Sequence, residues 1–257
     1  MAVAMTDGQL DLRLARDAED LHAVHRLRYD VFVAELGGGG PSADHAARLE
    51  KDRFDEHADH LALFDRELQR GEDAVATYRL MSQEAARAGA GFYSAGEYDL
   101  SPLERGRRRL MEFGRSCVRA DRRDGRTLFL LWQGLADRVE AAGADILFGV
   151  ASFHGADPGR HAAALSLLHH RHLAPPELRV HAIGSGAHRM DLVAPERVDR
   201  AAAAAALPPL LKSYLRHGGF VGEGAWIDGD FNTVDVCLVI DMARIPARTR
   251  NLYGARR

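Results

Sequence analysis

The chain has 257 residues, of which 46% are hydrophobic and 28% are charged, and its formal net charge is -3. This composition is typical of a globular protein with a sizeable core, and the slightly acidic balance argues against a general nucleic-acid binder. The N-terminus lacks the basic and apolar regions of a secretory signal, and no apolar run reaches the roughly 18 to 20 residues that span a bilayer. We therefore expect a cytoplasmic protein.

The predicted elements alternate between strands and helices along the chain. Apolar periodicity predicts a strand at 12–16, a helix at 18–36, a hairpin from 60–65 and 73–81, a strand at 111–118 and a helix that begins at Thr127. Almost wholly apolar strands follow at 144–153 and 234–242, with helices at 161–172 and 201–206 between them. This order predicts an α/β or α+β fold around a mixed sheet.

The domain organisation that we expect is one domain over residues 1–257. It would carry a helical insertion at about 158–212 and a basic C-terminal tail at 243–257. The two cysteines, Cys117 and Cys237, each lie in an apolar strand-like run. We expect them to be buried thiols and not a disulfide or a nucleophile.

An arginine-rich turn precedes the helix that begins at Thr127. Arg122, Gly125 and Thr127 have the spacing of the phosphate-binding turn of GNAT acyltransferases, R/Q-x-x-G-x-G/A, with threonine in the last position. A helix N-terminus offers backbone N–H groups and a partial positive charge to a phosphate. The turn lies within a run of arginines, namely Arg105, Arg107, Arg108, Arg109, Arg115, Arg119, Arg122, Arg123 and Arg126. This run suits a phosphopantetheine thioester on an acidic acyl carrier protein, although a solvated surface would show the same charges.

Glu112 and Gly114 suggest chemistry within the predicted strand at 111–118. If the residues alternate, the two share a face, and Gly114 would mark a bulge that frees a backbone N–H for an acyl oxyanion. Glu112 would then accept the proton of an attacking amine. The alternative is that Glu112 and Arg115 form a buried ion pair.

Further charged residues have spacings that allow a shared face or turn. Arg28 and Phe32 lie four apart in the first helix, and Asp52 and Asp55 lie three apart in "KDRFDEH". The carboxylates would hold a cationic substrate or organise Arg28 and Arg79, and the alternative is capping or surface solvation. The histidines at 169–173 have no evident carboxylate or cysteine partner nearby, so no metal site is expected.

Several segments together resemble one family, the ornithine N-acyltransferases of the ornithine-lipid pathway. They are "LRYDVF", "DRFDEHADHL", "TYRLM", "GFYSAGEYDLSP", "MEFGRSCV", "LLWQGLADRVE", "LFGVASFHGADP", "LPPLLKSYLRHGGFVGEGAWID" and "DFNTVDVCLVI", in order over about residues 12 to 242. The family is similar to the acyl-homoserine lactone synthases, whose pattern is matched here by Arg28, Phe32, Asp52, Asp55, Arg79, Glu112 and Arg115. An aromatic residue of those synthases is replaced within "LGGGG", which argues against S-adenosylmethionine as the substrate.

The resemblance implies a GNAT-like fold with a central, mostly antiparallel mixed sheet flanked by helices. It implies transfer of a 3-hydroxyacyl group from acyl carrier protein to the α-amine of ornithine, giving lyso-ornithine lipid, with no permanently bound cofactor. Glu112 would be the base and Gly114 the oxyanion donor, beside Arg115. The phosphopantetheine phosphate would lie at Arg122, Arg123, Gly125, Arg126 and Thr127.

The resemblance leaves the binding of the amino acid open. Arg79 or Arg28 would bind its carboxylate, and Asp52 or Asp55 its distal ammonium group. Other amines would be compatible with the same chemistry, which would make the protein a signal synthase or another N-acyl amino acid synthase. An inert carrier-binding protein would show the same basic patch. The tail arginines, Arg244, Arg248, Arg250, Arg256 and Arg257, would give weak peripheral attraction to anionic lipid, or would simply be solvated.

Overall fold

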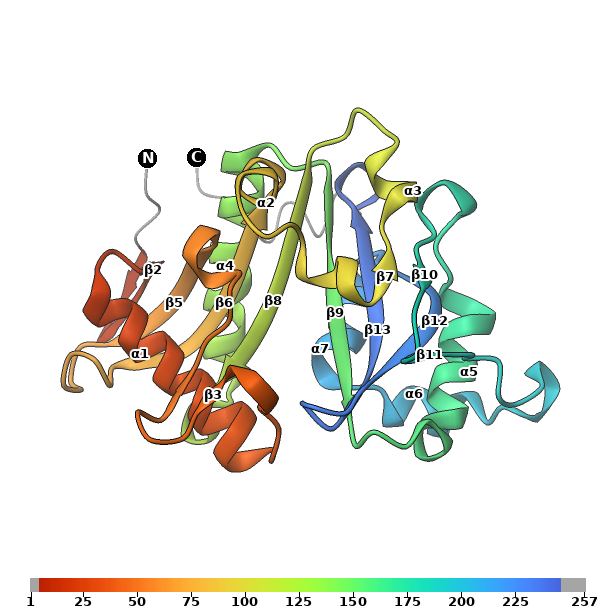
Figure 1. Cartoon of the computed structure of the whole chain (residues 1–257), viewed down its shortest axis with the longest axis horizontal. Coiled ribbons are helices and arrows are strands. Elements are labelled where there is room, and N and C mark those ends of the chain that lie inside the picture. Colours follow the sequence, from red (N-terminus) through yellow and green to blue (C-terminus); the bar gives the residue numbers. More distant parts are fainter. Residues whose placement is uncertain (1–4, 246–257) are drawn as a thin grey trace. The chain divides into compact units, whose positions relative to one another are not determined.

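The computed structural model describes residues 5–245, and their contacts divide them into two compact units (Figure 1). The first unit comprises residues 5–91 and 113–143, and the second comprises residues 92–112 and 144–245. The division falls within strand β8 (Leu110–Val118), because Glu112 belongs to the second unit and the next residue belongs to the first. The expectation from the sequence that residues 1–257 form one domain stays a prediction.

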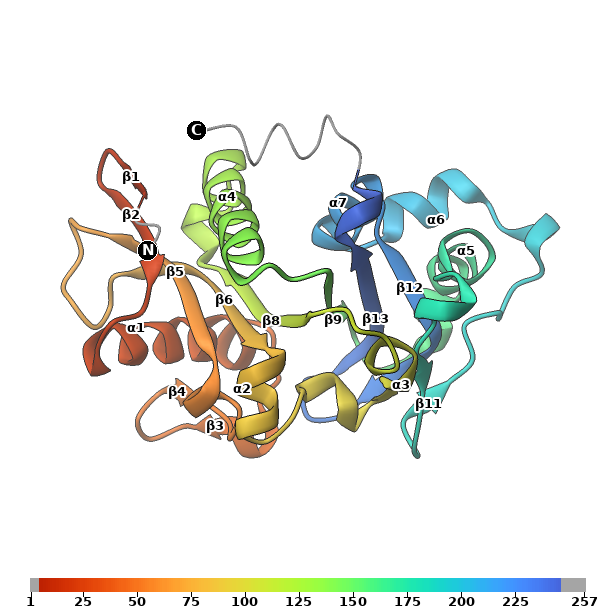
Figure 2. The same cartoon turned by 90° about the horizontal axis from the view of Figure 1, so that it is seen from above.

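The first unit is a sheet with a helix on each face (Figure 2). Helix α1 (Ala18–Arg28) lies on one face and helix α4 (Gly125–Ala142) lies on the other. The sheet strands, in spatial order, are β1 (Met5–Asp7), β2 (Leu10–Leu14), β5 (Asp59–Asp65), β6 (Ala74–Ser82) and the end of β8. The shorter elements are β3 (Ala43–Asp44), β4 (Leu49–Glu50) and α2 (Gln83–Ala88).

Local sequence explains where the two long helices begin and end. The side chain of Asp124 accepts a hydrogen bond from the backbone N–H of Thr127 at 2.7 Å, so α4 begins at Gly125, before the predicted start. It ends at Gly143, whose φ of 58° suits glycine. The predicted helix at 18–36 is α-helical only as far as Arg28, and Tyr29–Glu35 form a wider π-helical turn.

The second unit is built on a sheet whose strands, in spatial order, are β9 (Ile146–His154), β13 (Thr233–Asp241), β12 (Phe220–Asp228), β10 (His181–Ala182) and β7 (Tyr98–Asp99). The start of β8 joins it, since Leu110–Glu112 pair in parallel with Ile146–Phe148. The remaining elements are β11 (Ala187–His188), α3 (Ser101–Glu104), α5 (Ala162–His172), α6 (Arg200–Ala206) and α7 (Pro209–Arg216). Helices α5 and α7 lie on one side of β13, and the segment that contains α3 lies on the other (Figure 2).

The predicted fold class, a mixed and mostly antiparallel sheet flanked by helices, is confirmed. The predicted hairpin corresponds to β5 and β6, which pair antiparallel, and the predicted strands at 144–153 and 234–242 correspond to β9 and β13. Between 158 and 212 the chain forms α5 and α6, and it also forms the short strands β10 and β11, which join the sheet. The limits of the predicted insertion stay a prediction.

Candidate functional site

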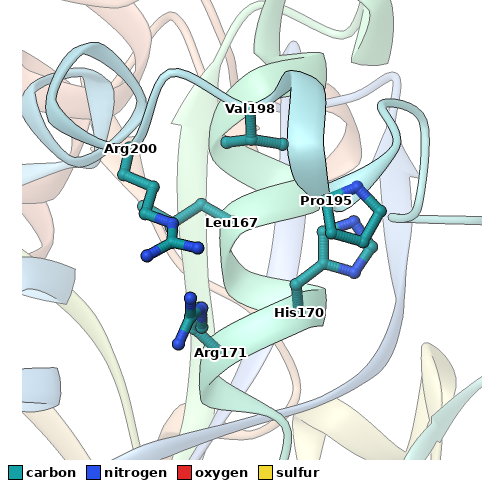
Figure 3. A pocket seen from close by; sticks show the side chains of 6 residues that line it. All are labelled: Leu167, His170, Arg171, Pro195, Val198 and Arg200. Carbon is teal, nitrogen blue, oxygen red and sulfur yellow. The ribbon is translucent and has the colours of Figure 1, made fainter.

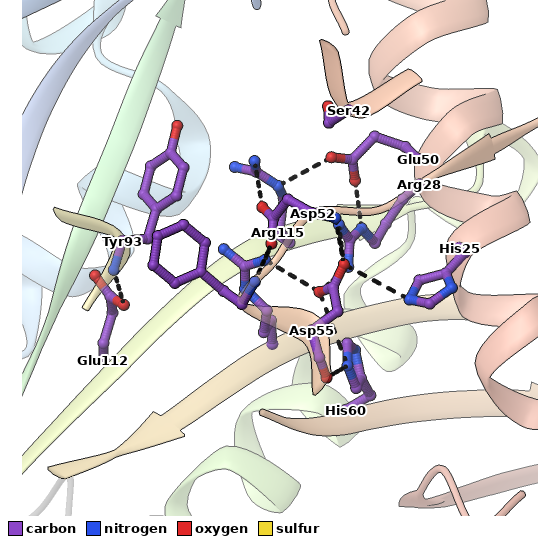
Figure 4. Close-up of polar contacts among 12 residues, drawn as sticks. His25, Arg28, Ser42, Glu50, Asp52, Asp55, His60, Tyr93, Glu112 and Arg115 are labelled. Carbon is purple, nitrogen blue, oxygen red and sulfur yellow. Dashed lines mark hydrogen bonds and ion pairs between the residues drawn. The ribbon is translucent and has the colours of Figure 1, made fainter. Parts of the chain in front are cut away.

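A buried network of charges lies where α1 faces the loop after β4 in the first unit (Figure 4). The side chains of Arg28 and Glu50 have no exposed surface, and they form an ion pair through Nε of the arginine. The other two guanidinium nitrogens of Arg28 donate to the carboxylate of Asp55, at 2.7 and 3.1 Å. Arg28 is therefore held by two carboxylates at once, in a fork geometry that fixes its orientation.

Two further arginines close this network. Arg79 donates to Asp52 at 2.6 Å and to Asp55 at 3.0 Å. Arg115 donates to Asp52 at 3.0 Å, and its Nε lies 3.3 Å from the carboxylate of Glu50. The result is a closed ring of alternating charge, which we call the ion-pair ring: Arg28, Glu50, Arg115, Asp52, Arg79 and Asp55. Its three positive charges balance its three negative charges. Buried charges are tolerated when each is paired with an opposite charge, as all six are in this ring.

Arg115 occupies the ring through an unusual backbone conformation. Its φ is 48°, in the left-handed region that side chains other than glycine rarely adopt. Gly114 does not have a positive φ, and a Cβ at that position would meet no heavy atom within 4 Å. The irregularity in β8 is therefore at Arg115, one residue after the predicted bulge. Strain of this kind persists where the surroundings fix the residue, and here the carboxylates of Glu50 and Asp52 do so.

Two histidines border the ring at Asp55. His25 lies 3.7 Å and His60 lies 3.9 Å from its carboxylate, and the two imidazoles contact each other edge to face. Burial, and then the charge of Arg28, lowers the pKa of His25 to about 4, and burial also lowers the pKa of His60. Both are neutral near pH 7. The nitrogens and the carboxylate are close enough to hold a metal, but Asp55 also binds Arg28 and Arg79, whose charges oppose a cation there.

The lowered pKa of His25 makes stability depend on pH. As the pH falls through 6.5, the unfolded chain binds a proton at this histidine, whereas the folded protein does not do so until about pH 4. Acidification across this window therefore favours unfolding, and the loss from His25 amounts to about 3 kcal/mol. We expect His25→Gln to lose correspondingly less stability than the parent protein in urea unfolding at about pH 7 and about pH 4.5.

The control for this prediction is His22→Gln, which changes an exposed histidine on the same helix. It should lose as much stability on acidification as the parent protein. Equal losses in all three proteins would show that His25 is not the source of the pH dependence.

The predicted phosphate turn runs from the loop after β8 into the first turn of α4, and its Arg122 and Arg123 are paired with carboxylates. Arg122 donates to Asp65 at 2.6 Å, and Arg123 donates to both oxygens of Glu35 at 2.6 Å. The backbone N–H of Thr127 already donates to the carboxylate of Asp124, and the side chain of Thr127 is buried. A phosphate at Gly125 would therefore compete with carboxylates for the same donors. Arg126 extends towards Gly8, so the five residues predicted for this role lie together in the first unit.

Phe32 and the two cysteines belong to the apolar core. Phe32 packs against a buried cluster that includes Leu27, Ala62 and Cys117. Both thiols are free and buried, as predicted. Burial raises the pKa of Cys117 to about 12, and burial, followed by the charges of Glu112 and then Glu97, raises the pKa of Cys237 well above its usual range. Neither thiol is ionised near neutral pH, which argues against a cysteine nucleophile.

Glu112 is held in the second unit by backbone groups (Figure 4). Its side chain is buried, with 6% of the residue exposed. One carboxylate oxygen accepts a hydrogen bond from the N–H of Ser94 at 2.7 Å, and the other accepts from the N–H of Tyr93 at 2.8 Å. These two backbone donors fix the orientation of the carboxylate.

Several residues in these arrangements were not predicted from the sequence. Glu50, His25 and His60 were not singled out, although Glu50 lies only two positions before Asp52 in "LEKDRFDEH". A run of acids next to paired arginines is the signal that could have found Glu50. The partners of the histidines lie on other elements, so no local signal marks them.

A cavity of about 290 Å³ lies near α5 in the second unit (Figure 3). It is lined by Leu167, His170, Arg171, Pro195, Val198 and Arg200, which makes it basic. It coincides with the histidine-rich segment for which no metal was expected. Of the basic tail, Arg244 pairs with Glu177 and Asp241, whereas the other four tail arginines lie outside the described residues. Over residues 5–245, no helix is long and apolar enough to cross a membrane.

Comparison with known proteins gives consistent results for sequence and fold. A family model described as an acetyltransferase (GNAT) domain matches residues 27–133. The chain is 51% identical over 251 residues to the L-ornithine N(alpha)-acyltransferase of Rhodobacter capsulatus, which covers 96% of this chain and 95% of that protein. It is 41% identical to the protein of the same name from Brucella abortus, over 96% of this chain and 90% of that one. The crystal structure of the AHL synthase LasI matches 95% of each chain with a TM-score of 0.51 at 15% identity, which supports the fold alone.

Proposed function

The chain belongs to the family of L-ornithine N(alpha)-acyltransferases, and from this premise we propose that it moves a 3-hydroxyacyl group from acyl carrier protein to the α-amine of ornithine. The observation that carries the proposal is the 51% identity over nearly the whole chain. The enzyme is an acyltransferase with an amino-acid acceptor and an acyl thioester donor. The product would be lyso-ornithine lipid, the first intermediate of ornithine lipid synthesis.

In the proposed reaction Glu112 accepts a proton from the α-ammonium group and releases it to solvent, and the neutral amine attacks the thioester carbonyl, so that a C–N bond forms and the C–S bond then breaks. The second proton that the nitrogen loses passes to the departing thiolate. An α-amine has an ordinary pKa of about 8, so a single oriented carboxylate is sufficient help near pH 7. Both buried oxygens of Glu112 are aimed by backbone donors, which supports this role. No covalent enzyme intermediate is needed.

The other predicted roles remain part of the proposal. Gly114 would donate its N–H to the oxyanion, and the turn from Arg122 to Thr127 would receive the phosphate by exchange of its carboxylate partners. Arg28 pairs with two carboxylates and has no exposed surface, so we assign it to the positioning of its neighbours in the ion-pair ring. Arg79 also pairs with two carboxylates, Asp52 and Asp55, so it would bind the substrate carboxylate by exchange of one of these partners.

The direct test is mass spectrometry of the purified protein with 3-hydroxyacyl carrier protein and a panel of amino acids offered separately. Formation of N-acylornithine together with the free carrier thiol is the expected result. Acylation of a different amine would show that ornithine is not the acceptor. Binding of the carrier without any product would favour an inert carrier-binding protein.

The carrier requirement leads to a separate prediction. Arg105, Arg107 and Arg109 are exposed together in the second unit, in the loop before β8. If they attract an acidic carrier protein, their combined change to glutamate should raise the KM for acyl carrier protein about tenfold or more. The kcat/KM for an acyl-pantetheine donor without the protein should stay unchanged.

A matched control is the combined change of Arg160, Arg189 and Arg197 to glutamate, since these arginines are also exposed in the second unit. It alters the net charge equally and should leave both donors unaffected. An equal rise in KM for the two triple variants would remove the local docking role and leave only a general charge effect.

A further inference from the structure

Three buried carboxyl groups meet in the second unit. They belong to Glu97, Asp228 and Asp235, which have 4%, 6% and 3% of their surface exposed. Each offers an oxygen, and these oxygens all lie within 4.8 Å of one another. Carboxylates this close repel one another when ionised, so a cation placed among them would be strongly favoured.

A hydroxyl group points to the same place. Thr233 is directly opposite Asp228 in the β12–β13 pair, and it lies two residues before Asp235 on β13, so the three side chains share one face of the sheet. Thr233 is only 9% exposed, and its Oγ1 has no hydrogen-bond partner within residues 5–245. A buried hydroxyl of this kind is costly unless a ligand supplies its partner.

The acidic cluster and Glu112 lie on the same face of the second unit's sheet. Glu112 is in register with Phe148 on β9, and Phe148 is in register with Val239 on β13. Asp235 lies an even number of residues from Val239, so its side chain emerges on that same face. Its partner on β9, Ser152, is exposed, so the surface beside the cluster is open to solvent.

The segment 93–98 contacts Glu112 and also contributes Glu97 to the acidic cluster. The N–H of Tyr93 holds the carboxylate of Glu112, and Glu97 follows four residues later. The hydroxyl of Tyr98 then donates to the backbone carbonyl of Asp235 at 2.9 Å, which anchors the segment over β13. The position of Glu97 in the cluster is thus coupled to the position of Glu112.

We propose that Glu97, Asp228 and Asp235, with the hydroxyl of Thr233, bind the distal ammonium group of the amino-acid acceptor and so select a basic acceptor. This inference rests on the proposed function, since it names the subsite that recognises the side chain of ornithine. An ammonium group donates up to three hydrogen bonds, and the cluster provides carboxylate and hydroxyl oxygens on one face. Asp52 and Asp55, which were predicted from the sequence to bind this group, pair with arginines in the ion-pair ring.

The test compares ornithine with norvaline, which has the same carbon chain without the distal amine. The variants are Asp235→Asn and Glu97→Gln, which keep the shape of each side chain and remove its charge. Asp228 is left unchanged because its Oδ1 accepts from the N–H groups of Asp230 and Phe231 in the β12–β13 turn. We expect each variant to lower the ratio of kcat/KM for ornithine to that for norvaline about tenfold or more.

The matched control is Asp230→Asn, an exposed acid in the same hairpin, which should keep the parent ratio. Equal loss of activity with both acceptors, or an unchanged ratio, would overturn the inference. So would a Mg²⁺ or Ca²⁺ ion that raises the melting temperature of the parent protein and not that of Asp235→Asn. If the parent protein acylates neither acceptor, the proposed function fails first, which separates the two outcomes.

Discussion

Glu112→Gln is expected to lower turnover about 100-fold or more near pH 7, with little change in the KM for ornithine. The glutamine cannot take the proton of the amine, although it still accepts one of the hydrogen bonds that Tyr93 and Ser94 donate. The defect should shrink as the pH rises through about 8, because the substrate amine then loses its proton to water. Steady-state kinetics at several pH values measure this directly.

The pH dependence separates catalysis from structure. The amide of the variant faces one backbone N–H that it cannot satisfy, so part of the loss could come from a displaced loop. Such a loss would be the same at every pH, and the melting temperature would report it. Glu104→Gln, at an exposed site in the same unit, is the control and should keep full activity. A defect that does not change with pH would remove Glu112 as the base.

Arg28→Ala is expected to lower the free energy of unfolding by about 3 to 5 kcal/mol, because it leaves buried carboxylates without their cation. Glu50 has no exposed surface and Asp55 has very little, so water cannot replace the guanidinium. The free energy of unfolding of a typical domain is about 5 to 15 kcal/mol, so the expected loss is a large share of it. Urea unfolding monitored by circular dichroism at pH 7 gives the value.

The control is Arg26→Ala, on the same helix, where the arginine pairs with Glu72 at the surface. An exposed pair contributes about 1 kcal/mol or less, so this variant should be nearly as stable as the parent. Arg28→Met with Glu50→Gln replaces one buried pair by neutral groups of similar volume and should recover part of the loss. If Arg28→Ala and Arg26→Ala lost equal stability, the ion-pair ring would not be a major source of stability.

Much of the fold could be predicted because it depends on local periodicity. The hairpin of β5 and β6 and the apolar strands β9 and β13 follow from patterns of a few consecutive residues. The ends of the helices were predicted less accurately. The start of α4 depends on a single cap at Asp124, and the end of α1 depends on a π-helical turn for which the apolar pattern gives no signal.

The candidate site could be predicted only in part, for a similar reason. The residues of the family pattern were found because their identities can be read from the chain. Which side chains meet could not be found, since Glu50 reaches Arg115 across 65 positions and, in the acidic cluster, Glu97 meets Asp235 across 138. Spacing along the chain reports only neighbours within a turn or a strand.

The sequence by itself determined the family, the acyltransferase chemistry and the alternation of strands and helices, because these depend on residue identity and on periods of a few residues. The tertiary structure alone decided that three arginines and three carboxylates close into the ion-pair ring, and that a second set of acids gathers on the face of Glu112. The ring forms because α1 and the loop after β4 pack against β6 and β8. Asp228 and Asp235 share a face because of the register between β12 and β13, which is set by packing across the sheet.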